Sequence, residues 1–263
     1  MKISVLTPSL NSGEHLERAI QSVKNQDYDN WEHIIVDGGS SDNTIQILNG
    51  YPHLRWISEP DRGQSDAMNK AFRLSSGDII VYLNADDEFA PNIFGHIVGI
   101  FAEHHPDMVV GQTRVFKNGA ESISRPTIEY SDLKVLRGRF PVNPSSYFYV
   151  RRVQETIGDF PIDEHYTMDY WFLLRAFKRF KIFRTDVILG NFHFTGKNKT
   201  HRVDSFKAQR SIAINHALKF DLLSLPYVIY KLYTHSRSQN LILSILRATR
   251  NKIRSMHSTW VQM

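Results

Sequence analysis

The sequence predicts an α/β protein in which a mainly parallel β-sheet is covered by helices on both faces. Strand-like and helix-like stretches alternate along the first 105 residues, and that alternation is typical of parallel sheets. A polar cluster follows each predicted strand, at residues 7–11, 37–42, 59–66 and 84–87. Ligands bind at the carboxyl ends of the strands in such sheets. The clusters therefore indicate a binding site.

Apolar periodicity places the individual elements. The predicted strands are residues 3–7, 32–37, 54–58 and 78–83. The first predicted helix carries Leu16, Ala19, Ile20 and Val23 on one face. Asn11, followed three positions later by Glu14, resembles a capping box at its start. Two further helices are expected near residues 44–48 and 67–72.

The second half of the chain predicts an extension of the same domain. Residues 106–165 contain short strand candidates at 108–115 and 146–150, separated by Pro, Gly and Asn. This pattern favours antiparallel strands added to the sheet. From residue 205 onward the pattern is helical. We therefore expect one domain over residues 1–204 and a C-terminal helical region over 205–263.

Composition excludes several classes of protein. The chain has 263 residues, no cysteine and a formal net charge of +5, so a disulfide scaffold and a thiolate metal site are both excluded. No acidic residue follows Asp221, whereas six basic residues do: Lys231, Arg237, Arg247, Arg250, Lys252 and Arg254. The rest is nearly neutral, which argues against nucleic-acid binding. No apolar run approaches about 18 residues, and no signal peptide is evident, so we expect a cytoplasmic protein.

The most informative stretch is the predicted strand at residues 79–83 and the carboxylates of Asp86 and Asp87 just after it. Ionised carboxylates at a buried strand end are costly unless a cation compensates them. Mg²⁺ and Mn²⁺ prefer carboxylate oxygens and commonly share them with substrate phosphates. The stretch therefore suggests a metal site for a phosphorylated substrate. The alternative is that one of these residues only caps the next helix.

Five motifs occur in the order seen in one enzyme family. They are ISVLTPSLN (3–11), VDGGSSDNT (36–44), EPDRGQSDAMN (59–69), GDIIVYLNADD (77–87) and MDYWFLLR (168–175). Over roughly residues 1–200 the chain resembles glycosyltransferase family 2. The resemblance implies the Rossmann-like GT-A fold, with a nucleotide-sugar-binding half at 1–105 and an acceptor-binding half at 106–204.

The resemblance also implies an activity. The protein would be an inverting, metal-dependent hexosyltransferase that moves a sugar from a nucleotide diphosphate, with UDP-hexose or UDP-HexNAc favoured, to a saccharide hydroxyl. The EPDRGQSDA and LNADD motifs are similar to those of bacterial enzymes that assemble O-antigen, capsule or exopolysaccharide. In those enzymes the acceptor is typically linked to undecaprenyl diphosphate.

The family's metal position falls on Asp86, which would bind Mn²⁺ or Mg²⁺. Asn84 stands where many members carry a first Asp, so with Ala85 it would contact the donor rather than the metal. Asp87 would support the metal or contact a sugar hydroxyl.

The resemblance places the nucleoside near Asp37, which would hydrogen-bond the uracil; the alternative is that Asp37 only caps the turn through Gly38 and Gly39. Thr7, Pro8 and Ser9 would line the same pocket, and Glu14 would reach the nucleoside. Leu10 replaces a frequent Tyr, which predicts weaker base stacking there. Arg62 would lie near ribose or phosphate oxygens. Asp66 would hold the transferred sugar or simply cap its helix.

The base expected from the resemblance is Asp169, which would deprotonate the acceptor hydroxyl. The alternatives are a simple helix cap at Asp169 and Glu164 as the base. Residues 192–202 resemble the loop that closes over the pyrophosphate, with Lys199 and Thr200 at its basic and hydroxyl positions. The family's histidine position falls on Thr195, with His193 and His201 nearby. The alternative is that each histidine lies on the surface without a role in the site.

Three competing functions remain to be weighed. A sugar nucleotidyltransferase would carry a Gly-rich basic loop after the first strand, and a dinucleotide oxidoreductase would carry Gly-x-Gly-x-x-Gly there; residues 7–11 contain neither. A non-catalytic GT-A-like binding module is the third, and it would lack donor hydrolysis.

The basic tail suggests contact with a membrane surface. Its apolar residues follow helical spacing, at Ile242, Ile245, Leu246, Thr249, Ile253 and Met256. We therefore expect peripheral contact through residues 221–263 at the inner face of the plasma membrane. The alternative is a helix packed on the protein or on a dimer partner. The oligomeric state is not predicted.

Overall fold

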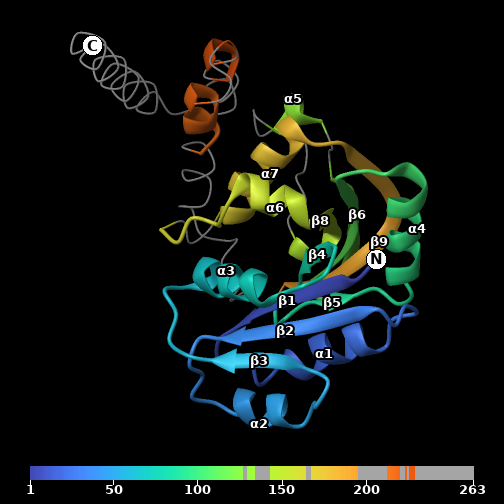
Figure 1. The fold of residues 1–263 in the computed structure, drawn as a ribbon, viewed down its shortest axis with the longest axis vertical. Coiled ribbons are helices and arrows are strands. Elements are labelled where there is room, and N and C mark those ends of the chain that lie inside the picture. Colours follow the sequence, from blue (N-terminus) through green and yellow to red (C-terminus); the bar gives the residue numbers. More distant parts are fainter. Residues whose placement is uncertain are drawn as a thin grey trace, which may run out of the picture. The chain divides into compact units, whose positions relative to one another are not determined.

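The computed structural model describes residues 1–126, 129–133, 143–163, 167–194, 212–219, 223 and 225–228. The chain separates into two compact units, Met1–Ile212 and Ala213–Met263. The first unit contains the sheet, and Figure 1 shows its strands with helices on both faces. This is the α/β architecture that the alternating pattern predicted.

Four parallel strands form the first half of the sheet. They are β1 (Ile3–Ser9), β2 (Trp31–Asp37), β3 (Arg55–Ser58) and β4 (Ile79–Tyr82), in the spatial order β3-β2-β1-β4. Each lies within two residues of its predicted bounds. Their residues are almost all buried in β1 and β4, because both faces of these strands are covered.

Four helices belong to this half: α1 (Leu16–Lys24), α2 (Thr44–Asn49), α3 (Gln64–Leu74) and α4 (Phe94–His104). The four apolar positions predicted for the first helix are all buried in α1. The predicted capping box is wrong: α1 begins after His15 without a side-chain cap, and Asn11 has a left-handed backbone (φ 48°). Its side-chain oxygen instead accepts from the Ser41 N–H over 2.9 Å.

The second half extends the sheet with mixed polarity. Its strands are β5 (Glu88–Phe89), β6 (Met108–Lys117), β7 (Ala120–Ser124), β8 (Tyr147–Val150) and β9 (Ile182–Phe194). β8 runs antiparallel to β4 and β6, whereas β9 pairs parallel with β6. The antiparallel extension was predicted, but the long strand β9 was not. Phe192, His193 and Phe194 belong to β9, so the predicted loop at 192–202 cannot begin before residue 195.

The remaining elements of this half are α5 (Tyr130–Leu133), the 3-10 helix η1 (Pro144–Ser146), α6 (Arg151–Ile157) and α7 (Met168–Arg179). Helices α1 and α4 pack on one face of the sheet through a cluster that includes Val5, Val23, Val81 and Phe94. On the other face, aromatic contacts join the sheet to α7 and to the segment before it. Tyr82 packs edge-on against Phe160, and Tyr149 lies against Phe172 with ring centroids 5.0 Å apart.

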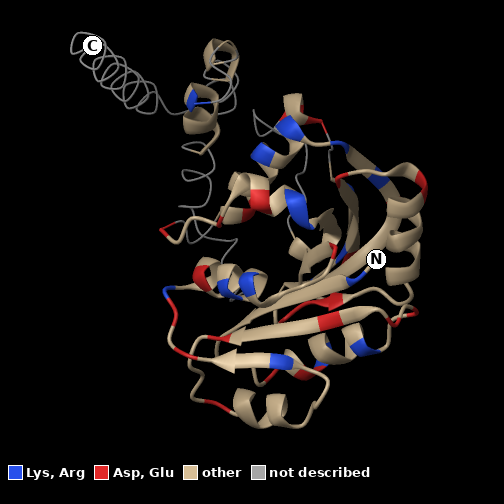
Figure 2. Ribbon diagram, in the orientation of Figure 1, with Lys and Arg blue, Asp and Glu red and all other residues tan. Residues whose placement is uncertain are grey.

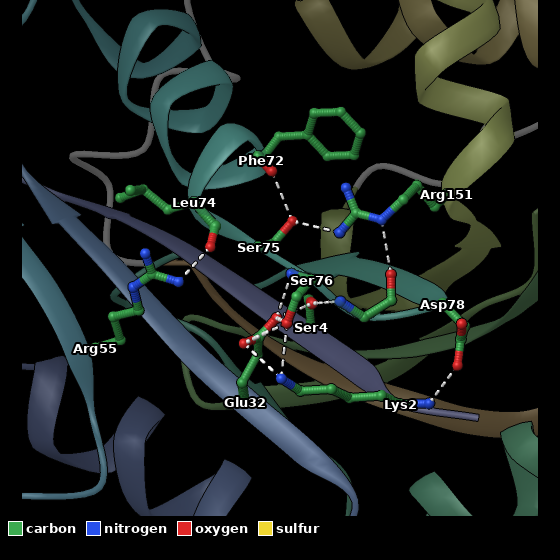
Figure 3. Close-up of polar contacts among 11 residues, drawn as sticks. Lys2, Ser4, Glu32, Arg55, Phe72, Leu74, Ser75, Ser76, Asp78 and Arg151 are labelled. Carbon is green, nitrogen blue, oxygen red and sulfur yellow. Dashed lines mark hydrogen bonds and ion pairs between the residues drawn. The ribbon is translucent and has the colours of Figure 1, made fainter.

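A polar cluster braces the amino end of the parallel strands (Figure 3). Glu32 accepts hydrogen bonds from Lys2 Nζ (2.8 Å), Ser4 Oγ (2.6 Å) and the Ser76 N–H (2.6 Å). Burial by itself would raise the pKa of Glu32, but these donors outweigh it and lower the pKa to about 2. Arg151 continues the cluster, donating to the Gly77 carbonyl over 2.9 Å.

The second unit is described only in part. Residues 213–219 and 225–228 are helical, as the pattern from residue 205 onward predicted. The six basic residues of the tail and its apolar stripe lie outside the described residues. Within the described part of the chain, no helix is long and apolar enough to cross a membrane.

Candidate active site

The carboxyl ends of the parallel strands bring distant polar residues to one edge of the sheet. Strand register places Ser9 beside Asp37 and Asp37 beside Ser58. Leu6 pairs with Tyr82, so the residues after β4 leave the sheet at the same edge. Figure 2 shows acidic residues on the loops that leave β2 and β3 there. The sequence-predicted convergence of the polar clusters is therefore present.

Asp37 is fully buried and serves as the organiser of the loop after β2. Its carboxylate accepts from the N–H groups of Gly39 (3.1 Å) and Ser40 (2.9 Å) and from the hydroxyls of Ser40 and Ser58 (2.7 Å for Ser58). Gly39 has φ of +87°, which a glycine adopts without strain. The turn-capping alternative for Asp37 is therefore realised, and base recognition stays a prediction.

Thr7, Pro8 and Ser9 are all buried at the end of β1. Thr7 Oγ1 lies 2.9 Å from Nε2 of His33, a histidine whose pKa is lowered to about 3 by burial and then by the neighbouring His53. Ser9 Oγ is different, because it has no hydrogen-bond partner among the described residues. Ser9 is therefore the residue of this group with an unused polar atom.

The loop after β3 is fastened by Asp66. Its carboxylate accepts from the Arg62 N–H over 3.1 Å and lies 3.6 Å from the charged groups of both Arg62 and Lys70. The Arg62 N–H and then the two cations lower the pKa of Asp66. The Arg62 side chain is 70% exposed. Asp66 thus secures the start of α3, while the Arg62 guanidinium extends into solvent.

Asn84 lies in a chain of side chains after β4. Its amide oxygen accepts from Gln64 Nε2 over 3.0 Å, and its amide nitrogen donates to Asp87 Oδ2 over 2.9 Å. An aspartate at position 84 would set two carboxylates against each other at this distance. Asn84, in the position where many family members carry Asp, can therefore donate a hydrogen bond to Asp87.

Asp87 is a buried carboxyl group with a strongly raised pKa. It is fully buried, and its Oδ1 has no hydrogen-bond partner of ordinary geometry among the described residues. Burial and the neighbouring Asp86 raise the pKa of Asp87 to about 8, although the amides of Asn84 and Asn143 and the backbone of His193 oppose the rise. The next helix, α4, begins only at Phe94, so the alternative that Asp86 or Asp87 caps it is wrong.

Asp86 is partly exposed, and Ala85 before it is buried. The Asp86 carbonyl accepts from the Arg18 guanidinium over 3.1 Å, and the same guanidinium bonds Glu88 over 2.8 Å. Glu88 in turn lies 2.7 Å from Nε2 of His193 on β9. His193 is therefore connected to the Asp86 loop through Glu88 and Arg18.

The carboxyl groups of Asp86 and Asp87 fit a metal site that is completed by substrate phosphates. Among the described residues, no three histidine or acidic side chains are arranged to hold a metal ion by themselves. Mg²⁺ and Mn²⁺ commonly bind through one or two carboxylates together with substrate phosphates and water. Asp86 supplies a partly exposed carboxylate, and burial, followed by the neighbouring Asp86, raises the pKa of Asp87. These residues fit a cation that arrives with a diphosphate.

Asp169 lies in the first turn of α7, where Thr167 is the N-cap residue. The alternative that Asp169 merely caps α7 is therefore wrong. Its Oδ1 accepts from the Tyr147 hydroxyl over 3.0 Å. Burial raises the pKa of Asp169 to about 6, and the Tyr147 hydrogen bond opposes that rise. A carboxylate with this pKa is a suitable general base near neutral pH.

Several predicted residues are not brought into the site by the described structure. Glu14 is exposed, with His15 at 3.7 Å. Leu10 is 58% exposed. Lys199, Thr200, Glu164, Thr195 and His201 lie outside the described residues, so their roles remain expectations.

Sequence reasoning missed the residues that hold the acidic groups in place: Arg18, Ser58, Glu88, Asn143 and Tyr147. Tyr147 and Asn143 lie in a segment with no recognisable motif. Their partners, Asp169 and Asp87, are 22 and 56 positions away in the chain. No local pattern carries that information.

A sequence profile described as glycosyl transferase family 2 matches residues 4–168. The chain belongs to this family. A curated relative, an uncharacterized glycosyltransferase of Mycobacterium tuberculosis (strain H37Rv), is 33% identical over 187 residues, which is 66% of this chain and 68% of the relative. A PGL/p-HBAD biosynthesis glycosyltransferase of Mycobacterium bovis (strain BCG) is 27% identical over 186 residues, 66% of this chain and 69% of the relative.

Solved structures show that the fold is GT-A. Staphylococcus aureus TarS residues 1–349, in complex with UDP-GlcNAc, matches 92% of this chain and 76% of its own with a TM-score of 0.70 and 19% identity. Glucosyl-3-phosphoglycerate synthase from M. tuberculosis, in complex with Mn²⁺, UDP and its product, matches 82% of this chain and 79% of its own with a TM-score of 0.56 and 20% identity.

Proposed function

We propose that the protein is an inverting glycosyltransferase that moves a sugar from a UDP-sugar to a saccharide hydroxyl, with Mn²⁺ or Mg²⁺ at Asp86. The observation that carries the proposal is the short segment 143–147, which connects two acidic centres. Asn143 at its start acts on the pKa of Asp87, and Tyr147 at its end donates to Asp169. The candidate metal-binding carboxylates and the candidate base are thereby tied to the same five residues.

Asp169 would accept the proton of the acceptor hydroxyl while that oxygen attacks the anomeric carbon opposite the leaving diphosphate. Attack from the opposite face inverts the configuration at that carbon. A bound divalent cation would offset the charge that develops on the diphosphate. Ser9 Oγ at the end of β1, together with Arg62 and Asn84 on the loops after β3 and β4, supplies the proposed donor contacts at this sheet edge. Thr7, Pro8, Glu14, Asp37, Asp66 and Ala85 complete the described residues of the proposed donor pocket.

Solved relatives supply the support for a uridine donor and for the metal. TarS has been crystallised with UDP and with UDP-GlcNAc. Glucosyl-3-phosphoglycerate synthase from M. tuberculosis has been crystallised with Mn²⁺ and UDP together. We extend these ligands to the present chain as part of the proposal, together with Lys199 and Thr200 as pyrophosphate contacts. The family membership argues against the sugar nucleotidyltransferase alternative.

The decisive experiment is a panel of UDP-sugars incubated with the purified protein, with and without Mn²⁺ or Mg²⁺. We expect metal-dependent release of UDP from one or a few donors. Asp86→Ala should abolish that release, whereas Asp27→Ala, a loop carboxylate that bonds the Gly95 N–H, should not. Undiminished release in excess EDTA would refute the metal role. An absence of release from every donor would favour the non-catalytic binding module.

We further propose that the acceptor is a lipid-linked saccharide, used in surface-polysaccharide assembly at the inner face of the plasma membrane, and that residues 221–263 contact that membrane. Each basic residue near an anionic surface contributes about 1 kcal/mol. Changing Arg247, Arg250 and Arg254 to Gln should weaken sedimentation with anionic liposomes about 100-fold at low salt and leave donor hydrolysis intact. Equal sedimentation of both proteins would favour the packed-helix alternative.

A further inference from the structure

Asp169 is held by a residue that cannot itself reach a substrate. The Tyr147 hydroxyl donates to Oδ1 of Asp169 over 3.0 Å. Tyr147 is fully buried, whereas Asp169 is partly exposed. Among the described residues, Tyr147 is the one side chain that hydrogen-bonds to the Asp169 carboxylate.

Strand pairing, ring stacking and the preceding Asn143 turn fix the position of the Tyr147 hydroxyl. Tyr147 is the first residue of β8 and pairs with Val110 of β6. Its ring stacks on that of Tyr149 with centroids 6.4 Å apart. Just before it, the Asn143 side chain accepts from the Ser145 N–H over 2.9 Å and from the Ser145 hydroxyl over 2.7 Å. The hydroxyl is therefore presented to Asp169 by a segment with little freedom to move.

The groups around this pair are neutral tyrosines. Tyr149 and Tyr82 are the other titratable groups that interact with Tyr147 or Asp169 in the described elements. Burial raises the pKa of all three tyrosines above the usual value. They therefore remain protonated at neutral pH, and Tyr147 acts on Asp169 as a hydrogen-bond donor rather than as a charge.

A fixed donor on one oxygen has two consequences for a carboxylate. It restricts rotation of the carboxylate plane, so the second oxygen stays in one orientation relative to the helix that carries the residue. It also stabilises the ionised form more than the protonated form, because only the ionised group is a strong acceptor. Both consequences assist a group that must receive a proton at a defined place.

We propose that Tyr147 is a positioning residue for the base, with its hydroxyl fixing Oδ1 of Asp169 so that Oδ2 faces the acceptor hydroxyl. This inference rests on the proposed function of Asp169. It assigns a catalytic consequence to a buried tyrosine that has no contact with substrate.

The test compares Tyr147→Phe with Tyr149→Phe. Tyr149 is the matched control because it is equally buried on the same strand, and its hydroxyl bonds Gln154 Oε1 over 2.6 Å instead. The measurement is the pH profile of kcat and kcat/KM with the UDP-sugar that the donor panel identifies. We expect Tyr147→Phe to lower kcat about 10-fold at neutral pH and to move the acidic limb upward by about one pH unit. The KM for the donor and the profile of Tyr149→Phe should match the wild type.

A second variant tests the donor strength without removing the hydroxyl. Incorporating 3-fluorotyrosine at position 147 makes the phenol a stronger donor, so the acidic limb should move to lower pH. An unshifted limb in both position-147 variants, with Asp169→Asn inactive, would overturn the positioning role alone. Full turnover in Asp169→Asn would overturn the proposed base and the positioning role together.

Discussion

Glu32 and Asp87 are carboxyl groups at opposite ends of the same sheet, and their surroundings shift their pKa values in opposite directions. At the amino end, donors from Lys2, Ser4 and Ser76 satisfy Glu32, and its pKa is lowered to about 2 (Figure 3). At the carboxyl end, Asp87 is buried, its Oδ1 has no hydrogen-bond partner of ordinary geometry within the described part of the chain, and its pKa is raised to about 8. The first arrangement stabilises the fold, whereas the second costs stability.

The contrast between the two ends indicates where an α/β sheet of this kind binds its ligands. Buried carboxylates are normally paired because an uncompensated charge is expensive. A site that leaves one uncompensated is poised for a partner that the chain does not contain. The same reasoning applies to Asp169, whose pKa is raised to about 6 by burial. The amino end needs no such partner.

The largest expected effect at the carboxyl end is on turnover. Asp169→Asn keeps the shape of the side chain and removes the proton acceptor. Turnover should fall by roughly 10²–10⁴-fold while the donor still binds. Rates at saturating donor and donor affinity by calorimetry would check this. A variant that lost donor affinity but kept its saturated rate would show that Asp169 is a binding residue.

At the amino end, Glu32→Gln should affect stability and leave activity per folded molecule unchanged. The free energy of unfolding at pH 7 should fall by about 2 kcal/mol, because Lys2 and Ser76 lose a charged acceptor. Because folding lowers the pKa of Glu32, its contribution is present above about pH 4.5 and is lost as the pH falls toward 2. Urea denaturation at several pH values measures this.

The control for Glu32→Gln is Glu103→Gln, at a side chain that is 77% exposed. It should change the free energy of unfolding by less than about 0.5 kcal/mol. Equal effects of the two substitutions would show that the amino-end cluster contributes no special stability.

Asp87→Asn should have a smaller effect, and its sign should be opposite to that of Glu32→Gln. In the metal-free protein with a chelator, Asp87→Asn should be more stable than the wild type at pH 8, by about 1 kcal/mol. Because folding raises the pKa of Asp87, the wild type loses stability as the pH rises from about 4 to 8. The advantage of the variant should therefore shrink between pH 8 and pH 5. An advantage of equal size at both pH values would contradict the assignment.

Local sequence predicted most of the parallel half of the fold. Apolar runs and helical periodicity placed β1 to β4 within two residues, and the signal is clearest for β1 and β4, whose residues are all buried. The same reasoning failed for β9, whose residues are mixed in burial along 13 positions. It also failed at the start of α1, where Asn11 bonds the loop after β2 instead of the helix.

The residues of the candidate site likewise fall into those that local sequence predicted and those that it did not. Local sequence was enough to identify the carboxylates at strand and helix ends, and the motifs that carry them indicated the family of the chain. The fold adds partners that no local pattern indicates: Asp37 accepts from Ser58, Asp169 accepts from Tyr147, and the Asn143 side chain acts on the pKa of Asp87. A pKa depends on solvent exclusion and on donors within about 3 Å, and Ser58, Tyr147 and Asn143 are each more than 20 positions away from the carboxylate that they affect.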